Sequence, residues 1–177
     1  MHERVPVVCF FDASPLIASC QFAVGGQSVA AYVLAGTPVQ IPPAVYMEVV
    51  TRGGTRPDAV EAARLVRAGQ LHLVDATRVG TPLHDLQYYQ LGLGEQEAIT
   101  LAARLPDAVF VTDDFLALIV AHRLGVMAQL FLDFVVGRTR SGALPVSEAQ
   151  QIVQAISPRY PRGFVPHSLA LLRSLVP

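Results

Sequence analysis

Residues 5–14 read VPVVCFFDAS, and this stretch decides the fold that the rest of the chain follows. Its near-continuous apolar run is typical of a strand that is buried on both faces of a parallel sheet, and the run ends at Asp12. Ser14 and Pro15 supply a capping hydroxyl and a proline suited to a first helical turn, which predicts a helix from Leu16 to about Phe22. The opening unit is therefore a strand, an acid and a helix.

The same scheme recurs along the chain, most clearly in DAVFVTDDFL at residues 107–116. Alternation of strands and helices predicts an α/β fold: one domain over 1–177 with three α/β/α layers and a mainly parallel central sheet of four or five strands. Acid-bearing motifs fall within 5–130, and two or three helices are expected in 131–177. Further strands are predicted at 38–41, 71–76, 108–111 and from 126, and further helices from Gly25-Gly26 to 34, from Pro42-Pro43 through Glu48, and at 57–68, 94–105 and 115–124.

Composition restricts the classes of protein that fit this chain. It has 177 residues, a net charge of -1 and 13 basic residues, all of them arginine, which excludes mechanisms that need a lysine ammonium. The weak charge argues against broad nonspecific coating of nucleic acid. No apolar run reaches the length of a membrane span and no secretory signal is recognisable, so we expect a soluble, cytoplasmic protein. Cys9 and Cys20 have no metal-binding or disulfide spacing and are predicted to be packing residues.

Acids follow two of the predicted strands at the point where each strand ends. Asp12 follows the first strand, and Asp113 and Asp114 follow the strand that ends at Thr112. Ligands of parallel sheets collect outside the carboxyl ends of the strands, so these side chains are expected to meet at one edge. The alternative is that Asp12, Ser14 and Asp114 only cap helices, as aspartate and serine commonly do.

Three glutamates are further candidates. Glu48 lies among apolar neighbours, which predicts a half-buried carboxylate, although a solvated glutamate at the edge of an amphipathic face fits the same pattern. Glu95 and Glu97 open the helix predicted at 94–105, where the helix dipole favours acids in any case. They diverge by roughly 200° around the helix axis, and Glu95 lies nearer the apolar stripe.

Carboxylates that converge without histidine or cysteine are hard oxygen ligands, suited to Mg²⁺ or Mn²⁺ and poorly suited to zinc. Such a cation would relieve the repulsion between like charges and could activate water for attack on a phosphoryl group. No metal-binding spacing connects the histidines, and none is assigned a role: His2, His72, His84, His122 and His167.

The order FFDAS (10–14), IPPAVYMEV (41–49), LGLGEQEAITLA (91–102) and VFVTDDFLALIVAHRLG (109–125) resembles the PIN-domain nucleases, most closely their VapC-like, toxin-like bacterial and archaeal subgroup. The resemblance runs from about Val5 to Leu130, with a similar final helix in GFVPHSLALLRSL. It implies a Mg²⁺- or Mn²⁺-dependent endoribonuclease in which water attacks phosphorus, leaving a 5′-phosphate and a 3′-hydroxyl. It also raises the expectation of a toxin with an antitoxin partner.

Through this resemblance, residues acquire expected roles. Asp12, Glu48, Glu97 and Asp114 match the four acids of the family, Glu95 and Asp113 are neighbours that could share the metal, and Ser14 and Thr112 match positions of small hydroxyls. The motif thus favours Glu97 where the helical wheel favours Glu95. Phe115 and Leu116 stand where close relatives often carry a basic residue, so RNA contacts are sought elsewhere, at Arg52, Arg56, Arg138 and Arg140.

Other functions compete with this one. A non-catalytic PIN-fold module that binds RNA or protein has the same acids. Aspartate-based phosphoryl transfer on a receiver-like or dehalogenase-like fold would usually require a lysine or a D-x-D pair, and nucleotide-binding glycine motifs are absent. The apolar stretch 117–124 favours a homodimer or a bound partner.

Overall fold

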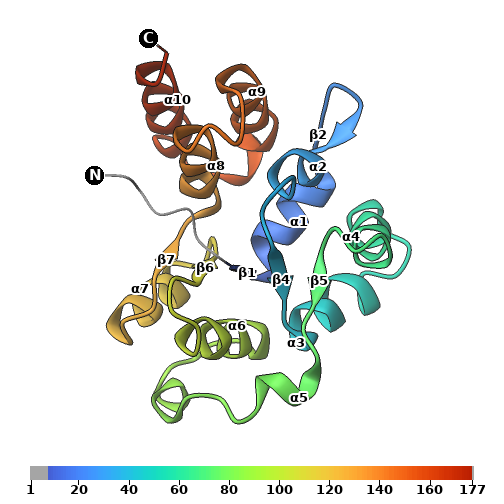
Figure 1. The fold of residues 1–177 in the computed structure, drawn as a ribbon, viewed down its shortest axis with the longest axis vertical. Helices are drawn as coiled ribbons and strands as arrows, with labels where there is room; N and C mark the ends of the chain where they lie inside the picture. Colours follow the sequence, from blue (N-terminus) through green and yellow to red (C-terminus); the bar gives the residue numbers. More distant parts are fainter. Residues whose placement is uncertain (1–7, 177) are drawn as a thin grey trace.

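A parallel five-stranded sheet forms the centre of the protein, in a computed structural model that describes residues 8–176 (Figure 1). The strand order is β5-β4-β1-β6-β7, so the chain turns back across the sheet at β1. Of the strand predicted at 5–11, the structure shows Cys9–Phe11 as β1. Residues 5–7 lie outside the described range. The strands are β1 (Cys9–Phe11), β4 (Val39–Ile41), β5 (His72–Leu73), β6 (Val109–Val111) and β7 (Ala128–Gln129).

The pleat of the central strands explains their continuous apolar sequence. Cys9 and Phe11 enter one core, whereas Phe10 between them enters the other, because successive side chains point to opposite faces. Each face is covered by helices, which confirms the predicted three-layer α/β/α fold. The face that Cys9 and Phe11 enter is covered by α1 (Ala13–Gln21), α2 (Val29–Val33), α4 (Pro57–Arg67), α8 (Phe131–Arg140), α9 (Val146–Ile156) and α10 (Phe164–Ser174). The face that Phe10 enters is covered by α5 (Ala76–Val79), the 3-10 helix η2 (His84–Tyr88), α6 (Leu93–Ala103) and α7 (Phe115–Arg123).

The first helix begins earlier than predicted. Asp12, rather than Ser14, is the N-cap of α1, and its carboxylate accepts a hydrogen bond from the Ala13 backbone N–H at 2.7 Å. Ser14 and Pro15 therefore lie inside the first turn, where proline is tolerated because the first amides of a helix have no partner within it. The acid after β1 is part of the helix start.

The helical stretch predicted after Gly25-Gly26 is interrupted. The two glycines, with φ values of +57° and +82°, form the turn of a hairpin between β2 (Ala23–Val24) and β3 (Gln27–Ser28). Positive φ at both central residues is the requirement of a tight hairpin turn, and glycine meets it without strain. Only α2, which begins at Val29, is helical.

The segment that carries Glu48 is a helix with an expanded last part. Helix α3 (Pro43–Tyr46) continues into the π-helical turn η1 (Met47–Thr51), and π-turns often occur at functional sites. Just after this turn, the backbone of Gly53 passes very close to that of Val49. A Cβ at Gly53 would lie 2.0 Å from the Val49 carbonyl oxygen. Glycine is thus required for this turn.

The predicted strand at 71–76 is shorter, because Asp75 caps α5 and accepts a hydrogen bond from Thr77 N.

Cys9 and Cys20 are buried free thiols, as predicted for packing residues. Within residues 8–176, no helix is long and apolar enough to cross a membrane.

Candidate functional site

An acidic cleft lies at the carboxyl edge of the sheet. The neighbouring strands β1 and β6 end there, next to the point where the strand order reverses, which is where open α/β sheets bind ligands. Three further side chains reach the same cleft from other elements. The cleft has a volume of about 500 Å³, no described histidine or cysteine lines it, and its charged residues are Asp12, Glu48, Glu95, Asp113, Asp114 and Arg159.

Hydrogen bonds fix the two acids that end β1 and β6 relative to each other. The Thr112 hydroxyl donates to Asp12 Oδ2 at 3.0 Å and accepts from Asp114 N at 3.0 Å. Asp114 also caps α7, since its Oδ1 accepts from Ala117 N at 2.8 Å. Capping and membership of the cleft, which the sequence presented as alternatives, therefore hold together for Asp12 and Asp114.

Burial and mutual repulsion disturb the protonation of two of these acids. Burial is the main cause that raises the pKa of Asp12 to about 6. The charges of Glu48 and Asp114 contribute to the rise, and hydrogen bonds from Ala13 and Thr112 oppose it. Burial and then the charge of Asp12 raise the pKa of Glu95 to about 7. The cleft thus holds carboxylates that would gain from a nearby cation.

The two glutamates of α6 point to different places. Glu95 lies in the cleft, and its Oε2 accepts from Gly92 N at 2.6 Å. Glu97 does not reach the cleft, because its Oε2 accepts from Ala44 N in the first turn of α3 at 2.9 Å. The helical divergence seen in the sequence is the physical reason, and it leaves Glu97 holding α3 against α6.

Helices α3 and α6 approach each other very closely beside Glu48. A Cβ at Gly94 would lie 2.9 Å from Val45 Cγ2 and 3.8 Å from Glu48 Oε2. The absence of a side chain at Gly94 therefore brings the Glu48 turn to the cleft. Glu48 itself is exposed rather than half-buried as predicted, because its apolar neighbours Val45 and Val49 turn to the core.

Asp113 has both carboxylate oxygens occupied. Its Oδ1 accepts from Phe131 N at 3.1 Å and its Oδ2 from the Tyr160 hydroxyl at 2.7 Å. Burial raises the pKa of Asp113, while the Tyr160 hydroxyl and the Phe131 amide lower it. Its contacts suit it to hold the C-terminal segment against the cleft more than to bind a ligand.

The sequence analysis missed Arg159 and Tyr160. Arg159 ends the short 3-10 helix η3 (Ser157–Arg159), and its guanidinium NH2 group donates to Ser14 Oγ at 3.3 Å. Ser14, which matches a small-hydroxyl position of the family, thus contacts a cation. Since Arg159 is 145 residues from Ser14 in sequence, only the tertiary fold reveals the pair.

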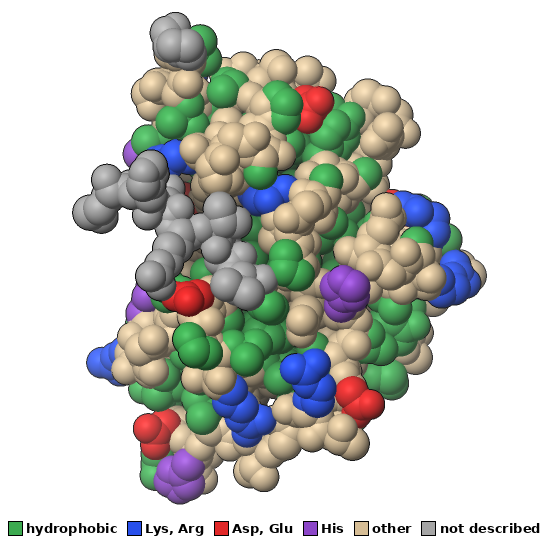
Figure 2. All heavy atoms as spheres, in the orientation of Figure 1, with side chains coloured by type: hydrophobic (Ala, Val, Ile, Leu, Met, Phe, Trp, Pro, Cys, Tyr) green, Lys and Arg blue, Asp and Glu red, His purple; other side chains and the backbone are tan. Residues whose placement is uncertain are grey.

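None of the four arginines proposed for RNA contacts lines the acidic cleft. Arg52 is exposed at the end of η1, Arg56 pairs with Asp58 at 3.1 Å, and Arg140 is exposed at the end of α8. On the face that Figure 2 shows, the basic side chains are scattered and form no continuous patch.

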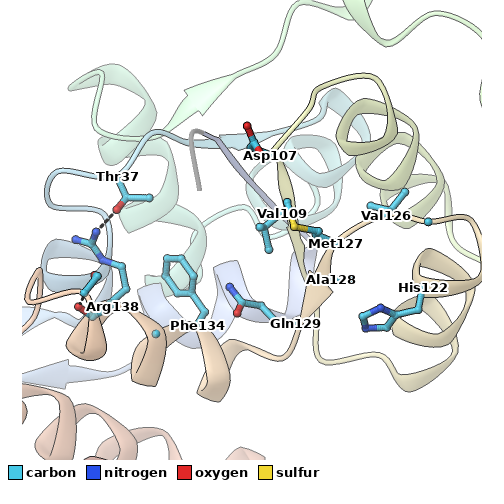
Figure 3. Close-up of a pocket in the computed structure, with 13 residues that line it drawn as sticks. Thr37, Asp107, Val109, His122, Val126, Met127, Ala128, Gln129, Phe134 and Arg138 are labelled. Atoms are coloured by element: carbon cyan, nitrogen blue, oxygen red, sulfur yellow. Dashed lines mark hydrogen bonds between the residues drawn. The ribbon is translucent and has the colours of Figure 1, made fainter. Parts of the chain in front are cut away.

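Arg138 is buried at the opposite, amino edge of the sheet. Its guanidinium donates to the Thr37 hydroxyl and the Ala35 carbonyl, and it lines a pocket of about 690 Å³ (Figure 3). Thr37 and Met127, which also line that pocket, precede strands rather than follow them. Arg138 therefore serves to hold the loop before β4 against α8.

The donor set of the cleft fits a hard divalent cation, because all its charged oxygens are carboxylates and three of the acids, Asp12, Glu95 and Asp113, have raised pKa values. Among residues 8–176, no three acids, histidines or cysteines already converge as a ligand cluster. Mg²⁺ usually keeps several waters and takes only one or two carboxylates directly, so a looser set is compatible with it. Asp12, Glu48, Glu95 and Asp114 are the residues that would hold it.

Without divalent cations, we expect the buried acid Asp12 to lower stability as the pH rises. Below about pH 4 the folded and unfolded states both hold the proton; between about pH 4 and 6 the unfolded state releases it first, so the free energy of unfolding falls. Displacement of the Asp12 pKa from 3.8 to about 6 corresponds to roughly 3 kcal/mol. About half of this difference, roughly 1.4 kcal/mol, falls between pH 5 and pH 8, because the unfolded state has already released most of its proton at pH 5. Urea unfolding in EDTA at these two pH values, compared with Asp12→Asn, measures it; an identical pH dependence of the two proteins would contradict it.

A family comparison agrees with this geometry. No curated protein and no solved structure matches the chain. A family model described as a PIN domain matches residues 8–159, which include every charged residue of the acidic cleft. The match does not distinguish a VapC-like subgroup, which stays a prediction. With most of its length matched and a five-stranded parallel sheet between helices, the chain belongs to the PIN-domain family, whose members are generally nucleases that use divalent metals.

Proposed function

We propose that the protein is a Mg²⁺- or Mn²⁺-dependent endoribonuclease. The observation that carries the proposal is the gathering of Asp12, Glu48, Glu95 and Asp114 in one cleft at the carboxyl edge of the sheet, in a chain of a nuclease family. Asp12 and Glu95 also have the raised pKa values of carboxylates that lack a neutralising partner. Cation binding would supply that partner.

Three of the four acids are held by hydrogen bonds, and Glu48 is the adaptable one. Asp12 is buried, and hydrogen bonds from Ala13 and Thr112 hold it in place. Asp114 caps α7 and Glu95 accepts from Gly92 N, so these two carboxylates are also held. Glu48 is exposed, so its carboxylate can adjust to a ligand with little disturbance of the core. Preorganised acids beside an adaptable one suit a site that assembles around a hydrated ion.

The reaction that fits the cleft is hydrolysis of a phosphodiester. A bound divalent cation would activate a water and neutralise charge that develops on the phosphoryl oxygens. The water oxygen forms the new bond to phosphorus, the bond from phosphorus to the 3′-oxygen breaks, and that oxygen leaves as a hydroxyl after taking up a proton. The protein's acids position the cation, and Thr112 keeps Asp12 oriented throughout.

Cleavage of single-stranded RNA with Mn²⁺ tests the function directly. We expect products with 5′-phosphate and 3′-hydroxyl ends, and no products in EDTA. Cleavage should persist when the nucleotide at the scissile bond lacks its 2′-hydroxyl, because water and not that hydroxyl is the nucleophile. Products with 2′,3′-cyclic phosphates, or equal cleavage in EDTA, would refute the mechanism.

The competing function is a PIN-fold module that binds RNA or protein without cleaving it. The local hydrogen bonds of Asp12 and Asp114, and the lack of a ready-made ligand cluster within residues 8–176, are what favour it. Its signature would be RNA or protein binding that is independent of divalent cations and accompanied by no cleavage. A role as the toxin of a toxin–antitoxin pair belongs to our proposal as a further step, and neutralisation by a cognate antitoxin would test it.

A further inference from the structure

The acidic cleft adjoins a second, smaller pocket of about 140 Å³. The two pockets share Ser14, Asp113 and Arg159, so Arg159 stands between them. The smaller pocket is aromatic, with Phe115 at the start of α7, Phe164 at the start of α10 and Tyr160 between η3 and α10. A cation at the junction of an acidic and an aromatic pocket is the arrangement from which the inference starts.

Arg159 is held at this junction by hydrogen bonds to neutral groups, and no ion pair with a described residue neutralises its positive charge. The bond from Tyr160 to Asp113, 2.7 Å long, anchors the adjacent residue to the end of β6. Among the described residues, the guanidinium donates to two neutral oxygens, Ser14 Oγ and Gln21 Oε1, both at 3.3 Å, and its charge lowers the pKa of nearby Asp113. It forms no ion pair with any residue that the structure describes, and contacts of this length are readily exchanged for a phosphate.

Phe115 offers an exposed aromatic surface next to this cation. It directly follows Asp114 of the cleft, and 51% of its surface is exposed. Its ring lies 5.8 Å from that of Phe164 at an interplanar angle of 56°, so one side of the ring is supported by the protein. Half-exposed aromatic rings are the surfaces on which unpaired bases stack.

We propose that Arg159 and Phe115 form a nucleotide subsite beside the acidic cleft, in which Arg159 binds a phosphate and Phe115 stacks on the base of an unpaired nucleotide next to the scissile bond. The inference rests on the proposed function, since it names the part of the substrate that the rim of the same cleft recognises. An unpaired base is required for stacking, so the subsite selects single-stranded over duplex RNA. The arginine also supplies the positive charge that an acidic cleft needs to attract a polyanion.

Binding measured without cleavage tests this subsite. In an Asp12→Asn background with Mg²⁺, fluorescence anisotropy of a labelled single-stranded oligoribonucleotide of mixed sequence gives Kd as a function of salt. We expect Arg159→Ala to weaken binding about tenfold and to reduce the slope of log K against log salt by about 0.7, the value for one phosphate contact on a single strand. Phe115→Ala should weaken binding about tenfold with no change of slope, and Phe115→Trp should restore it.

The chain supplies matched controls for both variants. Arg162 is a nearby exposed arginine and Leu116 an exposed apolar neighbour of Phe115, and neither lines the cleft or the aromatic pocket. Arg162→Ala and Leu116→Ala should bind within about twofold of the parent. Thermal melts of all variants verify that the fold is kept.

The outcomes separate this inference from the proposed function. If the wild type cleaves RNA and both variants keep its KM and Kd, the subsite is overturned and the proposed nuclease function is retained. Loss of binding in both variants, with no cleavage by the wild type, would support the subsite and overturn the nuclease. A parent protein that does not bind the oligoribonucleotide, or variants that weaken binding no more than their controls, would overturn the subsite.

Discussion

Asp12→Asn is expected to lower the cleavage rate at least about a thousandfold. Stabilisation of charge in a phosphoryl transition state by a bound cation amounts to several kcal/mol, and each 1.4 kcal/mol corresponds to a tenfold change in rate. Asp12 is the buried acid at the centre of the site, where the charges of Glu48 and Asp114 act on it. Its neutral replacement would remove the buried member of the ligand set.

The same substitution should leave the fold intact and make it more stable in EDTA at pH 8. Asparagine still caps a helix, while the cost of burying a charge disappears. Loss of the hydrogen bond donated by Thr112 offsets part of the gain, so we expect a rise in Tm of roughly 3–6 °C. At pH 5 the gain should fall to about half, because the folded state then keeps the proton of Asp12 while the unfolded state has already released it; the gain should vanish only below about pH 4.

Asp12→Ala is the matched comparison, since it removes the helix cap as well as the charge. It should be equally inactive but less stable than Asp12→Asn. Unchanged cleavage by Asp12→Asn in single-turnover assays would show that this carboxylate is only a structural cap.

The two glutamates of α6 are expected to respond differently to substitution by glutamine. We compare Glu95→Gln with Glu97→Gln. Glu95→Gln should reduce cleavage about a hundredfold or more, since it removes a carboxylate from the cleft. Glu97→Gln should keep cleavage within about threefold of the wild type, because the glutamine oxygen can still accept the hydrogen bond from Ala44 N. Glu97→Ala should instead cost about 1 kcal/mol of stability through that lost bond.

Rates measured at saturating Mn²⁺, with thermal melts of each variant, decide between the two glutamates. The reverse pattern, an inactive Glu97→Gln beside an active Glu95→Gln, would show that the family motif assigns the third acid correctly. It would also mean that α6 rotates or shifts when the substrate or the cation binds.

The layers of the fold were predictable because its strands are buried on both faces. Phe10 and Phe110 fill one core while their neighbours fill the other, which makes each strand a continuous apolar run that sequence alone reveals. The hairpin at Gly25-Gly26 was missed, since the strands on either side of the turn have only two residues each. Runs that short show no alternation to detect.

The acids at strand ends were predictable for a related reason. Parallel strands place their carboxyl ends at one edge, so Asp12 and Asp114 are brought together by topology alone. The choice between Glu95 and Glu97 was not settled, because it depends on how α6 packs against α3 at Gly94. Arg159 could not be inferred, since a hydrogen bond between distant segments, from Tyr160 to Asp113, brings it to the cleft. The homodimer and the antitoxin partner stay predictions.

The location of Mn²⁺ in a crystal of the protein tests the central claim most directly. Anomalous diffraction from a crystal soaked in Mn²⁺ should show an ion in the cleft, at about 2.1 Å from oxygens of Asp12 and of at least one of Glu48, Glu95 and Asp114. A saturated crystal with no ion in the cleft, and with Asp12 and Asp114 still engaged in their helix-capping hydrogen bonds, would contradict the account.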